Sequence, residues 1–278
     1  MPGLVLVEGL PGSGKTTVGR DLANWLSDNG IPSAHWGEGR PDHPVDFEQV
    51  AVLTRPVLQR ICDQFPQWER SLLAVATPEA DHVIVRHGMI DGLPQQLSTQ
   101  LDEFDSYDGH ISPELHSRVL TASWSRYGTA RPPDAVQIWD GVLLQNPVCS
   151  LLARHDQSAP VLNQHVRGLA EAVQTHRPVL VYLDPGDPEA SLRRAAEERS
   201  TAWLDFVIEY HTAQGYGVRR GLHGFDGYVE FMKVRREMEL DLIPTLPMPT
   251  LIVPVDPHTW PETTTRVTTF MTRHLADA

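Results

Sequence analysis

One octapeptide of the sequence has residue types and spacing that suit a definite chemical task. Residues 9–16 read Gly-Leu-Pro-Gly-Ser-Gly-Lys-Thr and match GxxxxGK[ST] at every fixed position. Glycines let the main chain curl around a phosphate and turn its N–H groups inward, where they form an anion-binding nest. An apolar run, Leu4 to Val7, precedes the octapeptide, and an amphipathic segment, Lys15 to Asn29, follows it. A strand, a glycine-rich loop and a helix in this order are the context in which the pattern binds nucleotide phosphates.

The residues at the end of the loop can be given separate roles. Lys15 can reach the β- and γ-phosphates of a nucleoside triphosphate, the Thr16 hydroxyl can ligate Mg²⁺, and Thr17 can hydrogen-bond a phosphate oxygen. We therefore expect ATP or GTP, with Mg²⁺, as the bound nucleotide. The residues expected to contact it are Gly9, Pro11, Gly12, Ser13, Gly14, Lys15, Thr16 and Thr17.

Three segments of the chain resemble the P-loop kinases of small molecules, especially the nucleoside and nucleotide kinase group that includes thymidylate kinase. Residues 8–17 resemble the opening of these enzymes. Residues 181–194, followed by Glu198 and Arg199, resemble the strand, turn and arginine-bearing lid helix of thymidylate kinases, and residues 228–235 resemble the helix after their lid. The resemblance implies a P-loop NTPase fold and phosphoryl transfer, and it makes a homodimer a possible assembly. Antibiotic phosphotransferases are similar in general plan.

Two acids follow predicted strands and are candidates for the chemistry. Asp140 ends the apolar segment Val136 to Asp140, at the position of an acid that holds Mg²⁺ directly or through water, although it could simply cap the turn that follows. Glu38 resembles by position the acid that takes the proton from the attacking hydroxyl in P-loop kinases of nucleosides and small antibiotics. Asp42 and Asp46 are alternatives for this base, and a solvated acidic loop would leave none of them catalytic.

Arginines after residue 187 are candidates for a lid. Phosphoryl transfer spreads negative charge over the equatorial oxygens, and an arginine placed beside them stabilises that charge. Arg194 and Arg199 are the expected lid residues, and Arg193 is an alternative. Pairing with Glu197 and Glu198 on a solvated helix is the structural explanation that competes with this role.

The acceptor of the phosphoryl group is the least defined part of the prediction. An aromatic ring beside arginines suits a ring compound with a polar or anionic group, although the tryptophan could equally lie in the core and the arginines at the surface. The segment Asp81 to Asp91 resembles the Asp-Arg-Tyr segment of thymidylate kinases but has Val85 and His87 in place of the aspartate and the tyrosine. Val255 to His258 are expected beside the adenine ring by position in the fold. The residues expected to bind the acceptor are Trp36, Arg40, Asp42 and Arg86.

The elements that must position these residues indicate an α/β fold. We expect one domain over 1–278, built on a parallel sheet of about five strands with helices on both faces. The predicted strands are Leu4–Val7, Ile31–Trp36, Ala135–Trp139, Pro178–Leu183 and Pro249–Val255. The predicted helices are Lys15–Asn29, Val161–Thr175, Pro188–Arg199, Thr201–Ala213, Tyr228–Ile243 and a final helix that carries Val267, Phe270, Met271 and Leu275 on one face.

Two stretches interrupt this regular order. Residues 38–133 are too long for a simple crossover, and we expect a mainly helical insertion that binds the acceptor. Helical patterns are present at Phe47–Phe65 and Ser112–Tyr127, with a short strand at Val83–Val85. Residues 187–227 are the expected lid region, and Gln214–Gly227, rich in glycine, is predicted to be a loop.

Composition excludes several classes of function. The chain has 36 acidic and 23 basic residues and a net charge of −13, which argues against broad binding to nucleic acid. Its apolar runs are too short to span a bilayer, so we expect no membrane partner. Cys62 and Cys149 have no metal-binding spacing and suit a reducing compartment, so we expect a cytoplasmic protein.

These observations favour a kinase that transfers the γ-phosphoryl group of ATP or GTP to a hydroxyl of a nucleoside-like, sugar-like or antibiotic-like small molecule. A nucleoside monophosphate kinase is an alternative, and a regulatory P-loop NTPase without a small-molecule acceptor is another. The monophosphate kinase would need arginines that converge on the acceptor phosphate. Those that the insertion offers are Arg40, Arg55, Arg60, Arg70 and Arg86.

Overall fold

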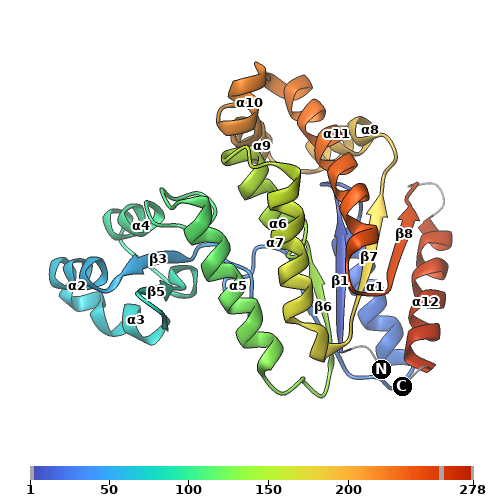
Figure 1. Cartoon of the computed structure of the whole chain (residues 1–278), viewed down its shortest axis with the longest axis horizontal. Coiled ribbons are helices and arrows are strands. Elements are labelled where there is room, and N and C mark those ends of the chain that lie inside the picture. The colour runs from blue at the N-terminus through green and yellow to red at the C-terminus, as the bar shows by residue number, and fades with distance from the viewer. Residues whose placement is uncertain (1–2, 257–259, 277–278) are drawn as a thin grey trace. The chain divides into compact units, whose positions relative to one another are not determined.

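A computed structural model describes residues 3–256 and 260–276 of the chain (Figure 1). The chain divides into two compact units. Unit 1 comprises Met1–Glu38 and Gly128–Ala278, and unit 2 comprises Gly39–Tyr127. No helix within the described ranges is long and apolar enough to cross a membrane.

Unit 1 is built on a five-stranded parallel sheet, which confirms the prediction of an α/β fold with about five parallel strands. Its central strand, β1, is buried along its whole length, as expected for a parallel sheet that is covered on both faces. In spatial order the strands are β2 (Ser33–Trp36), β6 (Val136–Asp140), β1 (Leu4–Gly9), β7 (Pro178–Asp184) and β8 (Thr250–Pro254).

Helices cover both faces of this sheet (Figure 1). On one face α1 (Lys15–Asp28) and α12 (Trp260–Ala276) pack against Val5 and Val7 of β1 and their neighbours. Successive side chains of a strand point to opposite faces, so Leu4, Leu6 and Glu8 face the other layer, which contains α7 (Ala159–Ala172) and α11 (Gly224–Leu242). The remaining helices of unit 1 are α6 (Gln145–Val148), the π-helical Cys149–Arg154, α8 (Pro188–Glu198), α9 (Thr201–Thr212) and α10 (Gly215–Arg220).

The order of the strands identifies one place where a ligand is expected. The connection from β1 leads to β2 at one edge of the sheet, whereas the connection from β7 leads to β8 at the opposite edge. The direction of winding therefore reverses between the adjacent strands β1 and β7. In open parallel sheets, ligands bind in the crevice beyond the carboxyl ends of the two strands at such a reversal. Residues 10–14, the glycine-rich loop, follow β1 at this point.

Unit 2 contains a three-stranded antiparallel sheet, which the sequence analysis did not predict as a sheet. The helical pattern expected at Phe47–Phe65 was wrong in its first half, where Ala51–Thr54 forms strand β3, and right in its second half, where a helix begins at Arg55 with Pro56 in its first turn. The strand expected at Val83–Val85 is part of β5. The strands are β3 (Ala51–Thr54), β4 (Ala76–Glu79) and β5 (His82–Val85), and the helices are α2 (Arg55–Gln64), α3 (Glu69–Ala74), α4 (Gln95–Asp102) and α5 (Pro113–Thr129).

The prediction of a loop at Gln214–Gly227 was also wrong. Helix α10 occupies part of this stretch, and α11 begins at Gly224. Gly217 supports close packing, because a Cβ atom there would lie 2.5 Å from the carbonyl oxygen of His211. Glycine at this position therefore reflects contact with α9 rather than an irregular chain.

Two helical glycines of unit 1 should respond in opposite ways to substitution by alanine. A Cβ atom at Gly128 would lie 1.7 Å from the carbonyl oxygen of Ala172, whereas one at Gly168 would meet nothing within 4 Å. We expect Gly128→Ala to lower the free energy of unfolding by about 2 kcal/mol or more. Gly168→Ala should raise it by about 0.5 to 1 kcal/mol, because alanine restricts the unfolded chain. Urea denaturation of both variants tests this, and equal effects would contradict the close approach of Gly128 to Ala172 within unit 1.

Candidate functional site

The glycine-rich loop connects the end of β1 to the start of α1. At two of its positions, neighbouring atoms leave no room for a side chain. Gly12 and Gly14 have φ angles of +77° and +90°, in the region that favours glycine. A Cβ atom at Gly12 would lie 2.5 Å from the carbonyl oxygen of Ser191, and one at Gly14 would lie 2.3 Å from the indole ring of Trp260. Neighbouring elements on both sides therefore hold the main chain of the loop in its curled form.

The N-terminus of α1 faces this loop and suits an anion. The first turn of α1 contains no acidic residue, and no side chain of the described residues caps the helix at Gly14. The first N–H groups of a helix lack partners within the helix, and the helix dipole adds positive potential there. The Ser13 hydroxyl is also buried, with no hydrogen-bond partner in the described part of the chain. An anion held by the loop could accept hydrogen bonds from all of these donors.

Lys15 brings a positive charge to the same place. Its Nζ atom lies 3.1 Å from the carbonyl oxygen of Gly9 and 3.4 Å from that of Leu10, so the side chain folds back along the loop. The chain contains only two lysines, Lys15 and the exposed Lys233 of α11. Lys15 is largely buried, and its ammonium group is therefore held against the loop rather than in solvent.

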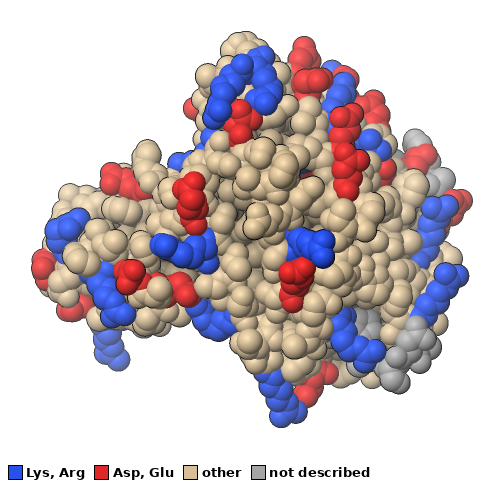
Figure 2. Space-filling view, in the orientation of Figure 1, with Lys and Arg blue, Asp and Glu red and all other residues tan. Residues whose placement is uncertain are grey.

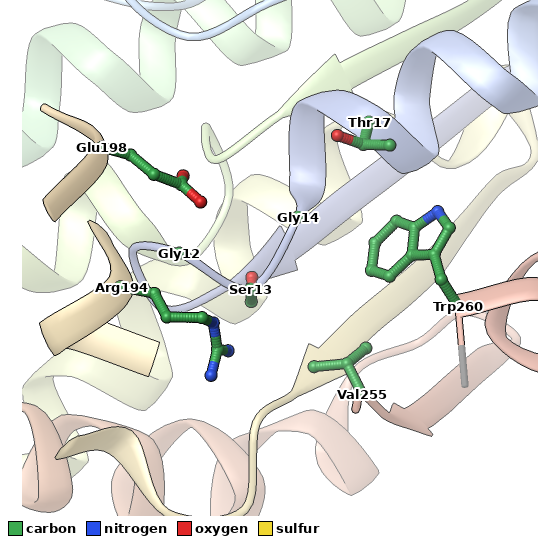
Figure 3. A pocket seen from close by; sticks show the side chains of 8 residues that line it. All are labelled: Gly12, Ser13, Gly14, Thr17, Arg194, Glu198, Val255 and Trp260. Atoms are coloured by element: carbon green, nitrogen blue, oxygen red, sulfur yellow. The ribbon is translucent and has the colours of Figure 1, made fainter. Parts of the chain in front are cut away.

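A pocket of about 370 Å³ opens over the loop, at the reversal point between β1 and β7. A volume of this size is in the range of small-molecule sites. Figure 3 shows Arg194 and Glu198 approaching the loop from α8 on one side, with Val255 and Trp260 on the other. Val255, which we expected beside the adenine ring, is among the residues that line this pocket, whereas residues 257–259, including His258, lie outside the described residues. The lining residues are Gly12, Ser13, Gly14, Thr17, Arg194, Glu198, Val255 and Trp260.

The arginines of the expected lid differ in their surroundings. Arg194 lines the pocket, but Arg199 does not, and its guanidinium lies 4.5 Å from the centre of the Trp203 ring. Arg193 is exposed and forms an ion pair of 2.6 Å with Glu189 on its own helix. Of these three residues, Arg194 is therefore the one that the structure brings to the loop.

Asp140 is completely buried at the end of β6, next to β1. Its Oδ2 atom lies 3.0 Å from Nε2 of His35 in β2, and its Oδ1 atom has no hydrogen-bond partner among the described residues. Thr16 is exposed in the first turn of α1. The described residues contain no group of three or more His, Cys, Asp and Glu side chains that could hold a metal ion. Any Mg²⁺ here would need phosphate oxygens and water as its other ligands, which is how Mg²⁺ is usually bound at phosphate sites.

The three acids proposed as the base have different environments. Glu38 of unit 1 is exposed beyond β2, and its carboxylate accepts a hydrogen bond from Nε2 of Gln145. In unit 2, Asp42 is held by Arg40 through contacts of 2.7 and 2.9 Å, and the Arg40 hydrogen bond lowers the pKa of Asp42. Asp46 is buried and accepts a hydrogen bond of 2.8 Å from the Tyr107 hydroxyl. Glu38 is therefore the candidate that lies at the carboxyl end of the parallel sheet.

The other residues expected to bind the acceptor make contacts within their own units. In unit 1 the Trp36 indole donates a 2.8 Å hydrogen bond to Gln137 of β6. In unit 2 the Arg86 guanidinium donates to the carbonyl oxygens of Pro41, Pro44 and Asp46, at 3.0 to 3.3 Å, and burial lowers its pKa. Arg86 thus holds the loop of residues 41–46 in place.

Sequence reasoning missed a buried acid beside the loop. Glu8, the penultimate residue of β1, is 0 % exposed, and its carboxylate accepts hydrogen bonds from the main-chain N–H groups of Leu143 (2.7 Å) and Gln145 (3.2 Å). Burial raises its pKa to about 7, against the opposing effect of these N–H groups, and the nearby Glu239 raises it further. The signal was present in the sequence, since Glu8 is the one charged residue in an otherwise apolar strand.

A second buried charged group lies on α11 and faces Glu8. Arg235 and Glu239 are both fully buried and form an ion pair of 2.6 Å. The hydroxyl of Tyr182, in β7, donates a 2.8 Å hydrogen bond to the same carboxylate. A buried hydrogen bond thus joins the carboxyl end of β7 to α11, while Glu8 joins the end of β1 to the segment that follows β6.

Comparison with known proteins gives no family. No protein-family model matches the chain, and no curated protein matches it in sequence. The function has to be inferred from the site itself.

Glu8 should make the stability of the protein depend on pH near neutrality. Its pKa of about 7 in the folded protein lies above its ordinary value of 4.5, so folding favours the protonated acid. This contribution is complete below pH 4.5 and is lost as the pH rises to about 7, a fall of about 3 kcal/mol in the free energy of unfolding. Glu8→Gln, which cannot titrate, should lack this fall. Urea denaturation of both proteins between pH 5 and 8 measures it, and parallel curves would show that Glu8 does not titrate in this range.

Proposed function

We propose that the chain is a kinase with a P-loop NTPase fold, which transfers the γ-phosphoryl group of ATP or GTP to a hydroxyl of a small molecule. One observation carries the proposal. A glycine-rich loop, the uncapped start of α1 and an arginine from the helix after β7 all line one pocket, at the reversal point of a parallel sheet. These are the parts that phosphoryl transfer requires, namely donors for the phosphates and a cation for the charge that develops.

The residues present fit a nucleotide and a magnesium ion. Main-chain N–H groups of the loop and of the first turn of α1 would hold the phosphates, with Lys15 beside the β- and γ-phosphates. Val255 and Trp260 offer apolar surface for the base. Thr16 and, directly or through water, Asp140 would hold Mg²⁺. When bound, Mg²⁺ would neutralise charge on the phosphate oxygens.

The reaction would proceed by in-line displacement. The acceptor oxygen forms a bond to the γ-phosphorus while the bond from that phosphorus to the β–γ bridging oxygen breaks. Glu38 takes the proton of the attacking hydroxyl, and the products are a phosphorylated acceptor and a nucleoside diphosphate. Arg194 stabilises the charge on the transferring group. Positioning and electrostatics would supply nearly all of the rate enhancement.

A small molecule is the acceptor that we propose, rather than nucleic acid. The chain carries a net charge of −13. Figure 2 shows basic and acidic side chains interspersed over the drawn face, with no stripe of basic residues on the described part of it. Binding to a nucleic-acid backbone depends on such a basic surface.

The experiment that tests this function is release of ADP from Mg-ATP by the purified protein, with and without pools of nucleosides, nucleotides, sugars and aminoglycoside-like compounds. Release that depends on an acceptor, with a product heavier by one phosphate in mass spectrometry, would establish the kinase and its substrate class. A phosphorylated nucleoside monophosphate would select the monophosphate kinase. Bound ATP whose slow hydrolysis no pool changes would favour the regulatory NTPase.

Lys15 should be essential for transfer and should be shielded by nucleotide. We expect Lys15→Ala to abolish transfer while the protein remains folded, and Lys233→Ala, at the exposed lysine of α11, to leave transfer unchanged. In the wild type, acylation by an amine-reactive reagent, mapped by mass spectrometry, should fall at Lys15 but not at Lys233 when Mg-ATP is added. Normal turnover by Lys15→Ala, or equal labelling with and without nucleotide, would refute this site.

Neighbouring arginines of α8 provide a second test. Arg194→Ala should lower kcat/KM by on the order of 100-fold or more, because it removes a cation beside the transferring group. Arg193→Ala should change it less than about twofold, since Arg193 pairs with Glu189 on the surface. Steady-state kinetics of both variants, with thermal unfolding as a control for folding, decides between them. Equal losses would remove Arg194 from the mechanism.

A further inference from the structure

A line of hydrogen bonds connects three strand ends of unit 1 at the edge where the phosphate loop lies. Glu8, at the end of β1, accepts hydrogen bonds from the N–H groups of Leu143 and Gln145, which follow β6. The side chain of Gln145 then donates from Nε2 to the carboxylate of Glu38, which follows β2. The line therefore begins directly before the phosphate loop and ends at the acid that we propose as the base.

Electrostatics fixes which end of the Gln145 side-chain amide faces the Glu38 carboxylate. A glutamine amide has a donor end and an acceptor end, whereas an ionised carboxylate can only accept. If the amide were turned around, two acceptor oxygens would face each other. Gln145 is almost fully buried, and its Oε1 atom has no hydrogen-bond partner within the described ranges, so no competing contact there favours the reversed orientation.

We propose that Gln145 is a positioning residue for Glu38, and that Glu8 holds Gln145 in place through the main chain after β6. The inference rests on the proposed function and deepens it, because it identifies what orients the base of that site. The amide of Gln145 occupies one oxygen of the Glu38 carboxylate. The other oxygen remains available to receive the proton of the acceptor hydroxyl. A base held in this way needs less reorganisation when the acceptor arrives.

Two polar groups that stay uncharged lie beside the Glu38 end of this line of hydrogen bonds. The Cys149 thiol and the Tyr228 hydroxyl face Glu38, and burial raises the pKa of both, with the Glu38 charge adding to the rise. Both therefore remain neutral near pH 7. Arg235, beside Cys149, supplies the nearby positive charge.

At the other end of the line, Glu8 faces Glu239 of α11, whose charge is balanced by Arg235 and whose second oxygen is occupied by Tyr182. Glu8 itself titrates near pH 7. Protonation neutralises this carboxylate and turns one of its two oxygens into a hydroxyl, which is a weaker acceptor for the N–H groups of Leu143 and Gln145. The line is therefore complete on the alkaline side of neutrality.

Kinetics with the acceptor found above provide the first test. Gln145→Leu should lower kcat by on the order of 10- to 100-fold, with KM for the nucleotide unchanged, because the base is disordered while the phosphate loop is intact. Gln174→Leu is the matched control, since the amide of Gln174 donates to the carbonyl oxygen of Ala170, at the end of the preceding helix α7, and its kcat should be that of the wild type. Between pH 6 and 8 the wild-type kcat should rise, whereas Glu8→Gln should stay low throughout. An unchanged kcat in Gln145→Leu, or a rise in KM alone, would overturn the proposal.

Nuclear magnetic resonance of ¹⁵N-labelled protein tests the same contacts without turnover. The side-chain amide of Gln145, identified by its loss in Gln145→Leu, should shift in Glu38→Gln. The main-chain amides of Leu143 and Gln145 should titrate with a midpoint near pH 7 in the wild type and not in Glu8→Gln. An unmoved Gln145 side-chain amide in Glu38→Gln would overturn the inference, whatever the activity. Intact contacts in a protein that phosphorylates no acceptor would instead overturn the proposed function.

Discussion

The close packing of neighbouring residues against two glycines of the glycine-rich loop is the constraint on which the site depends. On one side the main chain of Gly12 lies against Ser191 of α8, and on the other side Gly14 lies against the indole of Trp260. Neither position could carry a side chain unless the main chain of Ser191 or the ring of Trp260 shifted. The loop therefore keeps its curled form because three elements, α1, α8 and α12, are packed around it, and α1 and α12 are in turn packed against the sheet. Arg194 reaches the pocket for the same reason, since it lies one turn along α8 from the contact with Gly12.

Buried charges at the carboxyl edge of the sheet are the second organising feature. Burial of an isolated carboxylate is costly, and it is tolerated where hydrogen bonds and opposite charge satisfy it. Glu239 is paired with Arg235 and Tyr182, whereas Glu8 relies on main-chain N–H groups and is consequently easier to protonate. A protein gains little stability from such groups, but they fix one geometry. Here that geometry joins the ends of β1, β6 and β7, from which the residues of the candidate site project.

Much of unit 1 could be predicted from the sequence because its signals are local. Apolar runs bounded by turns identify the five strands, and the fixed spacing of residues 9–16 identifies the loop. Unit 2 was harder. Its sheet consists of strands of four residues, and the apolar residues of Ala51–Thr54 fit a helical period as well as a strand. Pairing with β5, which lies beyond α2 and α3 in the chain, decides between the two, and the pattern of residues 51–54 does not contain that information.

In the candidate site, too, some residues could be predicted from the sequence and others could not. Lys15, Arg194 and Val255 were predicted; Lys15 folds back along the glycine-rich loop, and Arg194 and Val255 line the pocket over it. Glu8 and Gln145 were missed, because their importance arises from hydrogen bonds between residues more than a hundred positions apart in the chain. Arg199 and Arg193 carry the same charge as Arg194, and only the packing of α8 shows which of the three faces the pocket. Side-chain direction, rather than residue type, is what the sequence did not provide.

The central place of β1 also has a consequence for how the chain folds. Both of its neighbours, β6 and β7, are encoded far downstream, after the whole of unit 2. Contacts between distant segments form slowly because the intervening chain must first be ordered or looped out. The antiparallel sheet of unit 2, by contrast, pairs strands within residues 51–85. During synthesis the glycine-rich loop therefore leaves the ribosome before unit 2, but it takes its final form only once the strands that flank β1 have arrived.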